Sequence, residues 1–259
     1  MAATKNDRES RDRLRRYTAR QQVHAAQVAR RRRDDVLAVV AVVVVVGLAV
    51  LTQVVWGQDD PGTAASTPSP SASSTAEATG TGDVPSAEIA EGRTWTGQFD
   101  LNDDVQLGVE LDGAAAPQAT SVLVDLVRKG FYTGTSCHRM SDADSAEFLQ
   151  CGSANGDGTG DAGFTFGPLE NVPSDGLYPA GTIAMARGES PDSQSTQFFV
   201  TYGDTYLDAS TGGYTVVGRV TSGLDQLTAN VTDAGLTPGT SETDGAPVVP
   251  TTITSASLE

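Results

Sequence analysis

Reactive side chains are few in the larger, C-terminal part of this 259-residue chain. Its cysteines are Cys137 and Cys151, and its one histidine beyond residue 35 is His138. Two cysteines cannot supply a four-cysteine zinc site or a disulfide-dense scaffold, and one histidine cannot build a multi-histidine metal centre. Cys137 and His138 are adjacent, but neighbouring strand residues point to opposite sides, and no acid is placed to orient the ring. We therefore expect His138 to be packed in the fold without a catalytic role. The alternative is a hydrolase that uses His138 or Cys137 in catalysis.

A glycine-rich run, GDGTGDAG, occupies residues 156–163 and superficially suggests calcium binding. It lacks the spaced oxygen ligands and the terminal glutamate of a calcium loop. We expect a loop beside a binding groove, and we predict neither a metal nor a cofactor.

Charge is distributed unevenly along the chain. The formal net charge is −16, yet residues 1–35 hold eleven of the 17 Lys and Arg and only five of the 33 Asp and Glu. The remainder is therefore strongly acidic, with six basic and 28 acidic side chains. Binding to nucleic acid needs basic residues that displace phosphate counterions, so the composition excludes nucleic acid as a partner of the large segment.

An apolar run predicts one transmembrane helix over residues 36–56. Its first part (VLAVVAVVVVVGLAVL) is uncharged, and Trp56 stands where an interfacial anchor belongs. Residues 30–33 are all arginine, and only acids follow the run at 59 and 60, so the positive-inside rule keeps residues 1–35 in the cytoplasm. A cleaved signal peptide is the alternative, but 35 residues precede the apolar core and no convincing Ala-x-Ala site follows.

The basic segment 1–35 and the anchor together predict a location. Residues 7–33 are rich in Ala, Arg and Gln and favour a juxtamembrane helix on anionic lipid, with nucleic-acid binding by this arm as the weaker alternative. The abundance of Arg, Ala, Val and Gly is typical of a GC-rich bacterial genome. We therefore expect a single-pass protein of a bacterial cytoplasmic membrane, with its N-terminus inside and its large domain outside.

Residues 57–92 predict a disordered linker. They are mostly Ser, Thr, Ala, Pro and Gly with almost no large apolar side chain, so they cannot bury enough surface to offset their ordering entropy. The folded domain is then expected over residues 93–259, which is long enough for one core.

Alternation predicts that this domain is mainly β. Val105, Leu107, Val109 and Leu111 alternate with more polar residues, as in a half-buried strand, and a partner over 95–101 would complete a hairpin.

Two helices and further strands follow. Pro117 suits a first helical turn and Gly130 a C-terminal stop, and a second helix is expected near 223–230. Strands are expected over residues 136–140, 182–186, 197–201, 214–220 and 251–256. Many strands and few helices favour a closed antiparallel barrel.

Five segments arrive in a fixed order: 130–139 (GFYTGTSCHR), 149–152 (LQCG), 181–187 (GTIAMAR), 196–201 (TQFFVT) and 214–220 (YTVVGRV). Together with ELDGAAAP at 110–117, they resemble a cyclophilin-type peptidyl-prolyl cis-trans isomerase over about residues 95–230. The resemblance implies a closed eight-stranded antiparallel barrel capped by two helices. It also implies a surface groove that binds a proline-containing segment of another protein, with no cofactor, metal or covalent intermediate.

The implied reaction is rotation about an imide bond, whose barrier of roughly 18–20 kcal/mol comes from amide resonance. Uncatalysed rotation takes tens to hundreds of seconds, slow enough to limit the folding of exported proteins, which are the expected substrates. The proline nitrogen gains a lone pair only in the transition state, so a donor fixed there accelerates the reaction.

The resemblance assigns catalysis to Arg139 and Gln150. Arg139 matches the family's catalytic arginine, whose planar guanidinium suits the developing lone pair and the neighbouring carbonyl. The alternative for an arginine in so acidic a domain is a structural ion pair on a strand. Gln150 matches a glutamine that bonds the substrate backbone and helps to hold the arginine.

Other matching positions line or flank the substrate groove. They are Phe148, Met185, Ala186, Arg187, Gln197, Phe199, Tyr206, Leu207 and Tyr214. Of two adjacent phenylalanines, Phe199 is expected in the proline pocket and Phe198 in the core, because neighbouring strand residues face opposite ways. Arg187 replaces the usual asparagine and adds a charge at the rim, and an inserted loop over 209–213 precedes Tyr214.

Two departures from the family pattern concern the pocket. Ten residues separate Arg139 from Gln150, where the family has a shorter connection. Glu147 stands where the family carries the pocket phenylalanine. Strand alternation predicts that Phe148 points away unless a bulge re-aims it. This departure favours the rival interpretation of a catalytically weak peptide-binding module or chaperone. Tyr206 replaces the usual tryptophan or phenylalanine, so any cyclosporin binding is expected to be weak.

The two cysteines are expected on neighbouring antiparallel strands, where an extracytoplasmic compartment permits a disulfide. The alternation of side chains along each strand, their parity, favours two buried thiols instead. Cys137 shares a face with Arg139, and Gln150 should lie on that same face, which puts its neighbour Cys151 on the other face. The disulfide remains the alternative.

Overall fold

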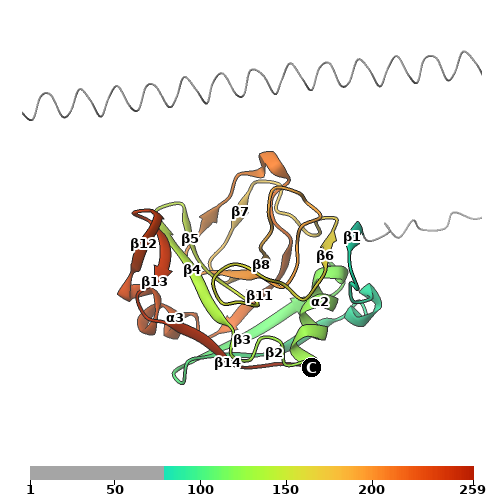
Figure 1. Cartoon of the computed structure of the whole chain (residues 1–259), viewed down its shortest axis with the longest axis horizontal. Helices are drawn as coiled ribbons and strands as arrows, with labels where there is room; N and C mark the ends of the chain where they lie inside the picture. Colours follow the sequence, from blue (N-terminus) through green and yellow to red (C-terminus); the bar gives the residue numbers. More distant parts are fainter. Residues whose placement is uncertain (1–78) are drawn as a thin grey trace, which may run out of the picture. The chain divides into compact units, whose positions relative to one another are not determined.

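The computed structural model describes residues 79–259 (Figure 1). The predicted cytoplasmic segment 1–35, the predicted transmembrane helix 36–56 and residues 57–78 of the predicted linker lie outside the described residues. Within residues 79–259, no helix is both long and apolar enough to cross a membrane.

Eight antiparallel strands close into a barrel, which confirms the predicted fold class. The strands are β2 (Thr94–Leu101), β3 (Val105–Asp112), β4 (Ser136–Ala143), β5 (Ala146–Cys151), β8 (Thr182–Met185), β9 (Phe198–Thr201), β11 (Val216–Ser222) and β14 (Thr251–Leu258). Around the barrel the order is β4, β14, β2, β3, β11, β8, β9 and β5, and a β4–β5 pairing closes it. Residues 79–259 contain the α-helices α2 (Pro117–Arg128) and α3 (Leu224–Asn230), both of which were predicted. Seven of these strands were given bounds from the sequence, and those bounds differ by at most three residues at either end, whereas β5 had no predicted bounds.

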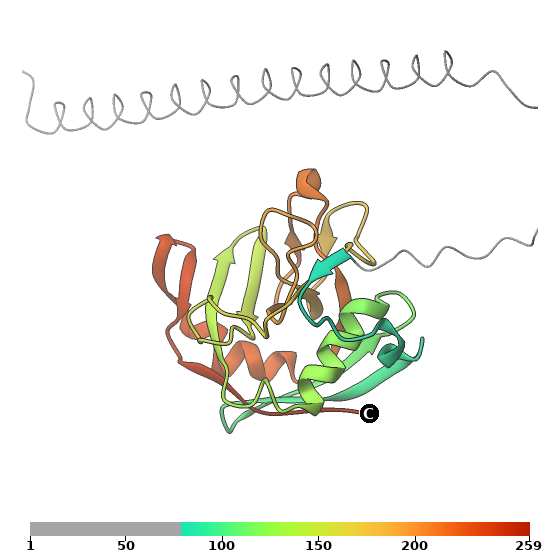
Figure 2. The same cartoon turned by 45° about the vertical axis from the view of Figure 1, so that its right-hand side comes forward.

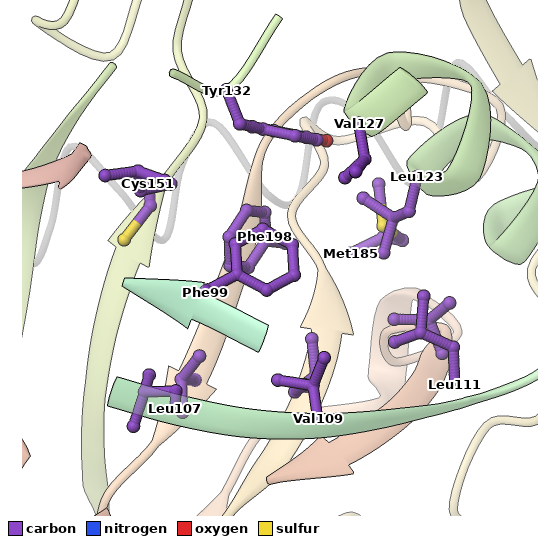
Figure 3. Close-up of a cluster of buried hydrophobic side chains, with 14 of the residues drawn as sticks. Phe99, Leu107, Val109, Leu111, Leu123, Val127, Tyr132, Cys151, Met185 and Phe198 are labelled. Atoms are coloured by element: carbon purple, nitrogen blue, oxygen red, sulfur yellow. The ribbon is translucent and has the colours of Figure 1, made fainter. Parts of the chain in front are cut away.

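The interior is filled by the alternating residues of the strands (Figure 3). Val105, Leu107, Val109 and Leu111 are between 0% and 3% exposed, as their spacing predicts. β2 and β3 pair in the predicted hairpin, with Trp95 opposite Leu111. Each fully buried aliphatic side chain contributes about 1.5–3 kcal/mol, so this core stabilises the strands that carry the groove.

Helix α2 begins at Pro117, whose missing N–H leaves no intrahelical bond unmade. The preceding residue is alanine and offers no side-chain cap. Instead, the Glu170 carboxylate accepts the backbone N–H groups of Gln118 (3.0 Å) and Ala119 (2.9 Å). Burial raises the pKa of Glu170, while these two hydrogen bonds act to lower it. A long-range contact therefore provides the cap that local sequence lacks.

Residues 79–91, which were predicted to belong to the linker, pair and pack with the domain. β1 (Thr79–Thr81) pairs with β6 (Thr165–Gly167), and the 3₁₀ helix η1 (Ala87–Ala90) lies against α2. The Ala90 N–H donates to Ser121 Oγ (2.9 Å), and its carbonyl accepts from Trp95 Nε1 (2.9 Å). Small residues can be held by their backbone groups, which composition does not reveal.

A hairpin outside the barrel was not predicted. It consists of β12 (Leu236–Ser241) and β13 (Asp244–Pro247), and β13 pairs with β4. In Figure 2 this red hairpin stands beside β4. The remaining short elements are β7 (Leu177–Tyr178), β10 (Thr205–Tyr206), η2 (Ala209–Thr211) and η3 (Thr232–Ala234).

Cys137 and Cys151 form a disulfide, so the prediction of two buried thiols was wrong. The two cysteines lie directly opposite each other on β4 and β5, and the next pair along is Arg139 with Gln150. The register shifts between Cys137 and Arg139, which leaves His138 as an extra residue on β4. A β-bulge of this kind breaks the alternation on which the parity argument depended.

Candidate active site

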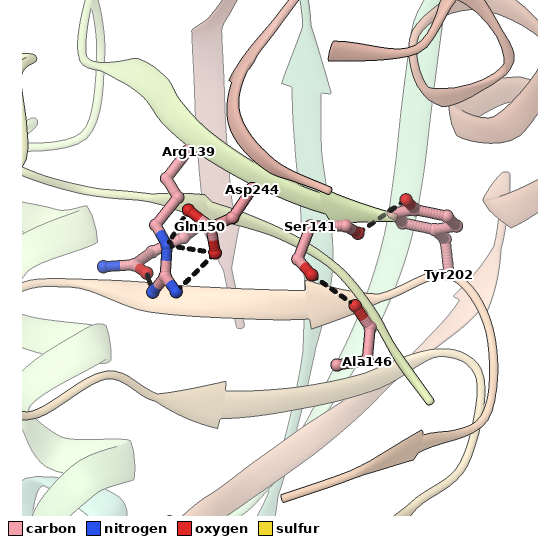
Figure 4. A network of polar contacts seen from close by, with 6 residues as sticks. All are labelled: Arg139, Ser141, Ala146, Gln150, Tyr202 and Asp244. Carbon is pink, nitrogen blue, oxygen red and sulfur yellow. Dashed lines mark hydrogen bonds and ion pairs between the residues drawn. The ribbon is translucent and has the colours of Figure 1, made fainter. Parts of the chain in front are cut away.

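Arg139 projects from β4 and is held by side chains from two neighbouring elements (Figure 4). Its Nε lies 3.0 and 3.1 Å from the two carboxylate oxygens of Asp244, and its Nη2 donates to one of them at 2.7 Å. Its Nη1 donates to Gln150 Oε1 at 3.0 Å. The guanidinium carbon lies 5.1 Å from the centre of the Phe148 ring. The guanidinium is therefore fixed although 45% of the side chain remains exposed.

A chain of amide hydrogen bonds continues from Arg139. Gln150 Nε2 donates to Gln197 Oε1 at 2.9 Å, and Gln197 Nε2 donates to the Gly158 carbonyl at 3.0 Å. The structure thus brings Arg139, Gln150 and Gln197 together, as predicted. It also ties them to the glycine-rich loop 156–163.

An aromatic cluster lies beside this polar chain. Its buried members are Phe148, Tyr178, Ala184 and Phe199, and Ala186, Leu207 and Tyr214 pack against them. The Phe199 ring centre lies 5.4 Å from that of Phe148 and 5.6 Å from that of Tyr214. Tyr178 was missed in the sequence analysis because it belongs to no matched segment. Phe198 lies in the main core instead, as predicted.

The expectation that Phe148 points away was wrong. Phe148 and Gln150 are two residues apart on β5, and side chains two apart share a face. Phe148 therefore joins Arg139 and Phe199 at the site. The Glu147 side chain lies against Gly203, where an added Cβ would collide with it. Strand β5 therefore still supplies an aromatic side chain, that of Phe148, to the cluster at the site.

The structure also corrects the role of Met185. Its side chain is 0% exposed and belongs to the main core, where Figure 3 shows it near Leu123. Ala184, one residue earlier on β8, faces the aromatic cluster. Because side chains alternate along a strand, the two cannot share a face. The partly buried Ala186 packs on the cluster, and its N–H donates to the Gln197 carbonyl at 2.9 Å.

Arg187 fastens the inserted loop 209–213. Its Nε donates to the Gly213 carbonyl at 2.7 Å, and its Nη2 donates to the Thr211 carbonyl at 2.9 Å. Its guanidinium carbon also lies 4.9 Å from the centre of the Tyr214 ring. The charge predicted at the rim is therefore committed to holding the rim in place.

A depression of about 280 Å³ adjoins the cluster. It is lined by Gln150, Gly158, Ala186, Arg187, Gly188, Ser193, Ser195 and Gln197. Tyr206, on β10, is 58% exposed, while its neighbour Leu207 packs against the cluster. A packed aromatic cluster, a depression lined mainly by polar residues and a fixed guanidinium thus lie side by side, which suits an extended peptide with one apolar ring.

Nucleophilic chemistry has little support. Cys137 is oxidised in the disulfide, so it offers no thiolate. Burial, followed by the nearby Arg139 charge, lowers the pKa of His138, while Asp157 acts to raise it. Its Nδ1 has no hydrogen-bond partner among the described residues. Within residues 79–259, no three His, Cys, Asp or Glu side chains gather to hold a metal ion.

Comparisons with known proteins agree on one family. The profile described as "Cyclophilin type peptidyl-prolyl cis-trans isomerase/CLD" matches residues 98–258. "Probable peptidyl-prolyl cis-trans isomerase B" of Mycobacterium tuberculosis is 36% identical over 166 residues, covering 59% of this chain and 51% of that protein. "Probable peptidyl-prolyl cis-trans isomerase" of Brucella suis is 33% identical over 133 residues, and the match covers 48% of this chain and 65% of that protein. This chain therefore spans about half the length of the mycobacterial relative.

Among solved structures, a Cryptosporidium parvum cyclophilin type peptidyl-prolyl cis-trans isomerase is 19% identical, with a TM-score of 0.49. The match covers 64% of this chain and 98% of that one.

Proposed function

Because the chain belongs to the cyclophilin-type peptidyl-prolyl cis-trans isomerase family, we propose that residues 79–259 accelerate rotation about X-Pro peptide bonds. The substrate is a proline-containing segment of another protein, laid along the groove. Its proline ring occupies the aromatic cluster around Phe199, and its backbone contacts Gln150 and Gln197. No cofactor, metal or covalent intermediate takes part.

Arg139 is the proposed catalytic residue. As the imide bond twists, resonance is lost and the nitrogen gains a lone pair, which a charged donor stabilises. The substrate in its planar ground state offers no such lone pair, so the contact forms mainly in the transition state. The observation that carries this proposal is the guanidinium fixed over Phe148 beside Phe199.

The test is the cis-to-trans conversion of a proline peptide by residues 79–259. We expect acceleration by the wild type and a loss of about 10²-fold in Arg139→Ala, the size typical for removal of one fixed donor. An Arg219→Ala variant is the matched control, because Arg219 forms an ion pair with Glu110, a residue outside the site. Full activity in Arg139→Ala would exclude this arginine from catalysis.

The rival function, a peptide-binding module or chaperone with weak catalysis, rested on Glu147 in place of a pocket phenylalanine. Phe148 supplies an aromatic wall instead, so that support is lost. Peptide binding by the wild type without acceleration of isomerisation would restore the rival.

We further propose that the domain serves exported proteins outside a bacterial cytoplasmic membrane, to which residues 36–56 anchor it. The support is the uncharged run, the arginines before it and the acids after it. Protease accessibility of the domain in intact spheroplasts tests this topology. Any binding of cyclosporin should be weak, because Tyr206 replaces a larger or more apolar ring.

A further inference from the structure

No sequence motif singles out Asp244, yet its carboxylate is the main partner of Arg139. Both of its oxygens lie 3.0–3.1 Å from Nε, and one accepts from Nη2 at 2.7 Å. The Asp244 side chain is only 21% exposed. A two-point contact between planar groups fixes the orientation of the guanidinium as well as its location.

The hairpin that carries Asp244 is itself fastened to the barrel. Asp244 lies opposite Ser141 on β4, and Gly245 lies opposite Met140. The Thr243 carbonyl accepts the Asp142 N–H at 3.1 Å. At Gly245 a Cβ would collide with the Thr237 carbonyl, so only glycine lets the two hairpin strands meet at this point. The carboxylate is therefore presented from a hairpin whose backbone pairs with the barrel.

The contacts leave the guanidinium able to act. It has five N–H donors. Asp244 takes the Nε donor and one on Nη2, and Gln150 takes one on Nη1. One donor on each terminal nitrogen remains for a substrate. The Phe148 ring, 5.1 Å from the guanidinium carbon, limits motion out of the plane.

We propose that Asp244 is a positioning residue, which holds Arg139 so that its two remaining donors meet the twisted imide. This inference rests on the proposed catalytic role of Arg139. A free arginine side chain samples many rotamers, and ordering it during the reaction would raise the barrier. The Arg139 donors contact the imide nitrogen mainly when the X-Pro bond is partly turned. Loss of the Asp244 carboxylate, which misplaces these donors, should therefore lower kcat and leave KM nearly unchanged.

The experiment uses the purified full-length protein and a proline peptide. Asp244→Ala is compared with Arg139→Ala and with Glu242→Gln, a control at an exposed acid in the turn of the same hairpin. We expect kcat to fall on the order of tenfold in Asp244→Ala, with KM within about twofold, as a displaced catalytic group predicts. Glu242→Gln should keep wild-type constants.

Asp244→Asn is a second variant that should keep the fold, because the pairing of β13 with β4 is made by backbone groups and the side chain keeps its size. Its amide has only one acceptor oxygen and therefore turns its N–H group toward either Nε or Nη2, so two donors meet. We expect a loss of kcat in this variant at an unchanged melting temperature. The Arg139 Nε–H resonance, assigned by its absence in Arg139→Lys, should exchange faster with water in both Asp244 variants.

The outcomes separate the two proposals. An inactive Arg139→Ala beside a fully active Asp244→Ala, or a change in KM alone, would overturn the positioning role and leave the catalytic one standing. A rise in kcat in Asp244→Ala would also overturn it, because the carboxylate would then restrain the arginine. Wild-type kcat in Arg139→Ala would instead refute the proposed catalytic role itself.

Discussion

Removing the disulfide should destabilise the domain by about 3 kcal/mol. Cys137 and Cys151 are 14 residues apart in the sequence, and closing a loop of that size restricts the unfolded chain by about that free energy. The described residues 79–259 lie within one compact unit. For a domain of this size, each kcal/mol shifts the melting temperature by roughly 2–4 °C, so a fall of about 6–12 °C is expected.

The assay is thermal and urea unfolding of residues 79–259, with and without a reductant. The wild type should lose stability when reduced, whereas the double variant Cys137→Ala, Cys151→Ala should melt low in both conditions. The pairing of Arg139 with Gln150 should persist, because Met140 with Leu149 continues the register beyond it. Isomerase activity of the variant at a temperature well below its melting point should therefore stay within a few-fold of wild type. Equal midpoints for oxidised, reduced and variant protein would refute the loop-closure argument.

Two further predictions concern neighbouring side chains with separate roles. Phe198→Leu should lower the free energy of unfolding by about 1–2 kcal/mol with little change in kcat/KM, because Phe198 lies in the main core. Phe199→Leu should mainly lower kcat/KM for the proline peptide, because Phe199 lies in the aromatic cluster at the site. The reverse pattern would show that Phe198 faces the site and Phe199 the core. The pKa of His138 is held below its ordinary value of 6.5, first by burial and then by the Arg139 charge, so the unfolded chain takes up this proton first as the pH falls. Stability should therefore decrease as the pH falls below about 6.5, and His138→Gln should flatten this part of the curve, as measured by urea midpoints. Parallel curves for the two proteins would show that His138 is not responsible.

Local patterns predicted most of the barrel. The alternation of Val105, Leu107, Val109 and Leu111 marked β3, because one buried face imposes a period of two. Family motifs located Arg139, and the structure places it beside the expected glutamines. The alternation and each family motif consist of short runs of consecutive residues, so both can be recognised in a sequence without three-dimensional information.

The errors arose where face or register had to be extrapolated. The bulge at His138 reversed the parity of Cys137, which turned an expected pair of thiols into a disulfide. Met185 was assigned by motif to a pocket that the alternation of β8 gives to Ala184. A pairing shift of one residue exchanges the two faces of a strand, and a sequence contains no direct record of it.

Asp244 illustrates a different limit, the choice of an ion-pair partner at long range. Residues 79–259 contain 25 acidic and only six basic side chains, so availability of acids does not decide which of them meets Arg139. The decision is made by the pairing of β13 with β4, which sets a carboxylate 105 residues away beside the guanidinium. An exposed ion pair of ordinary geometry contributes little to stability. Its effect here is to select one orientation of a long, flexible side chain, and that effect should therefore appear in kcat more than in the free energy of unfolding.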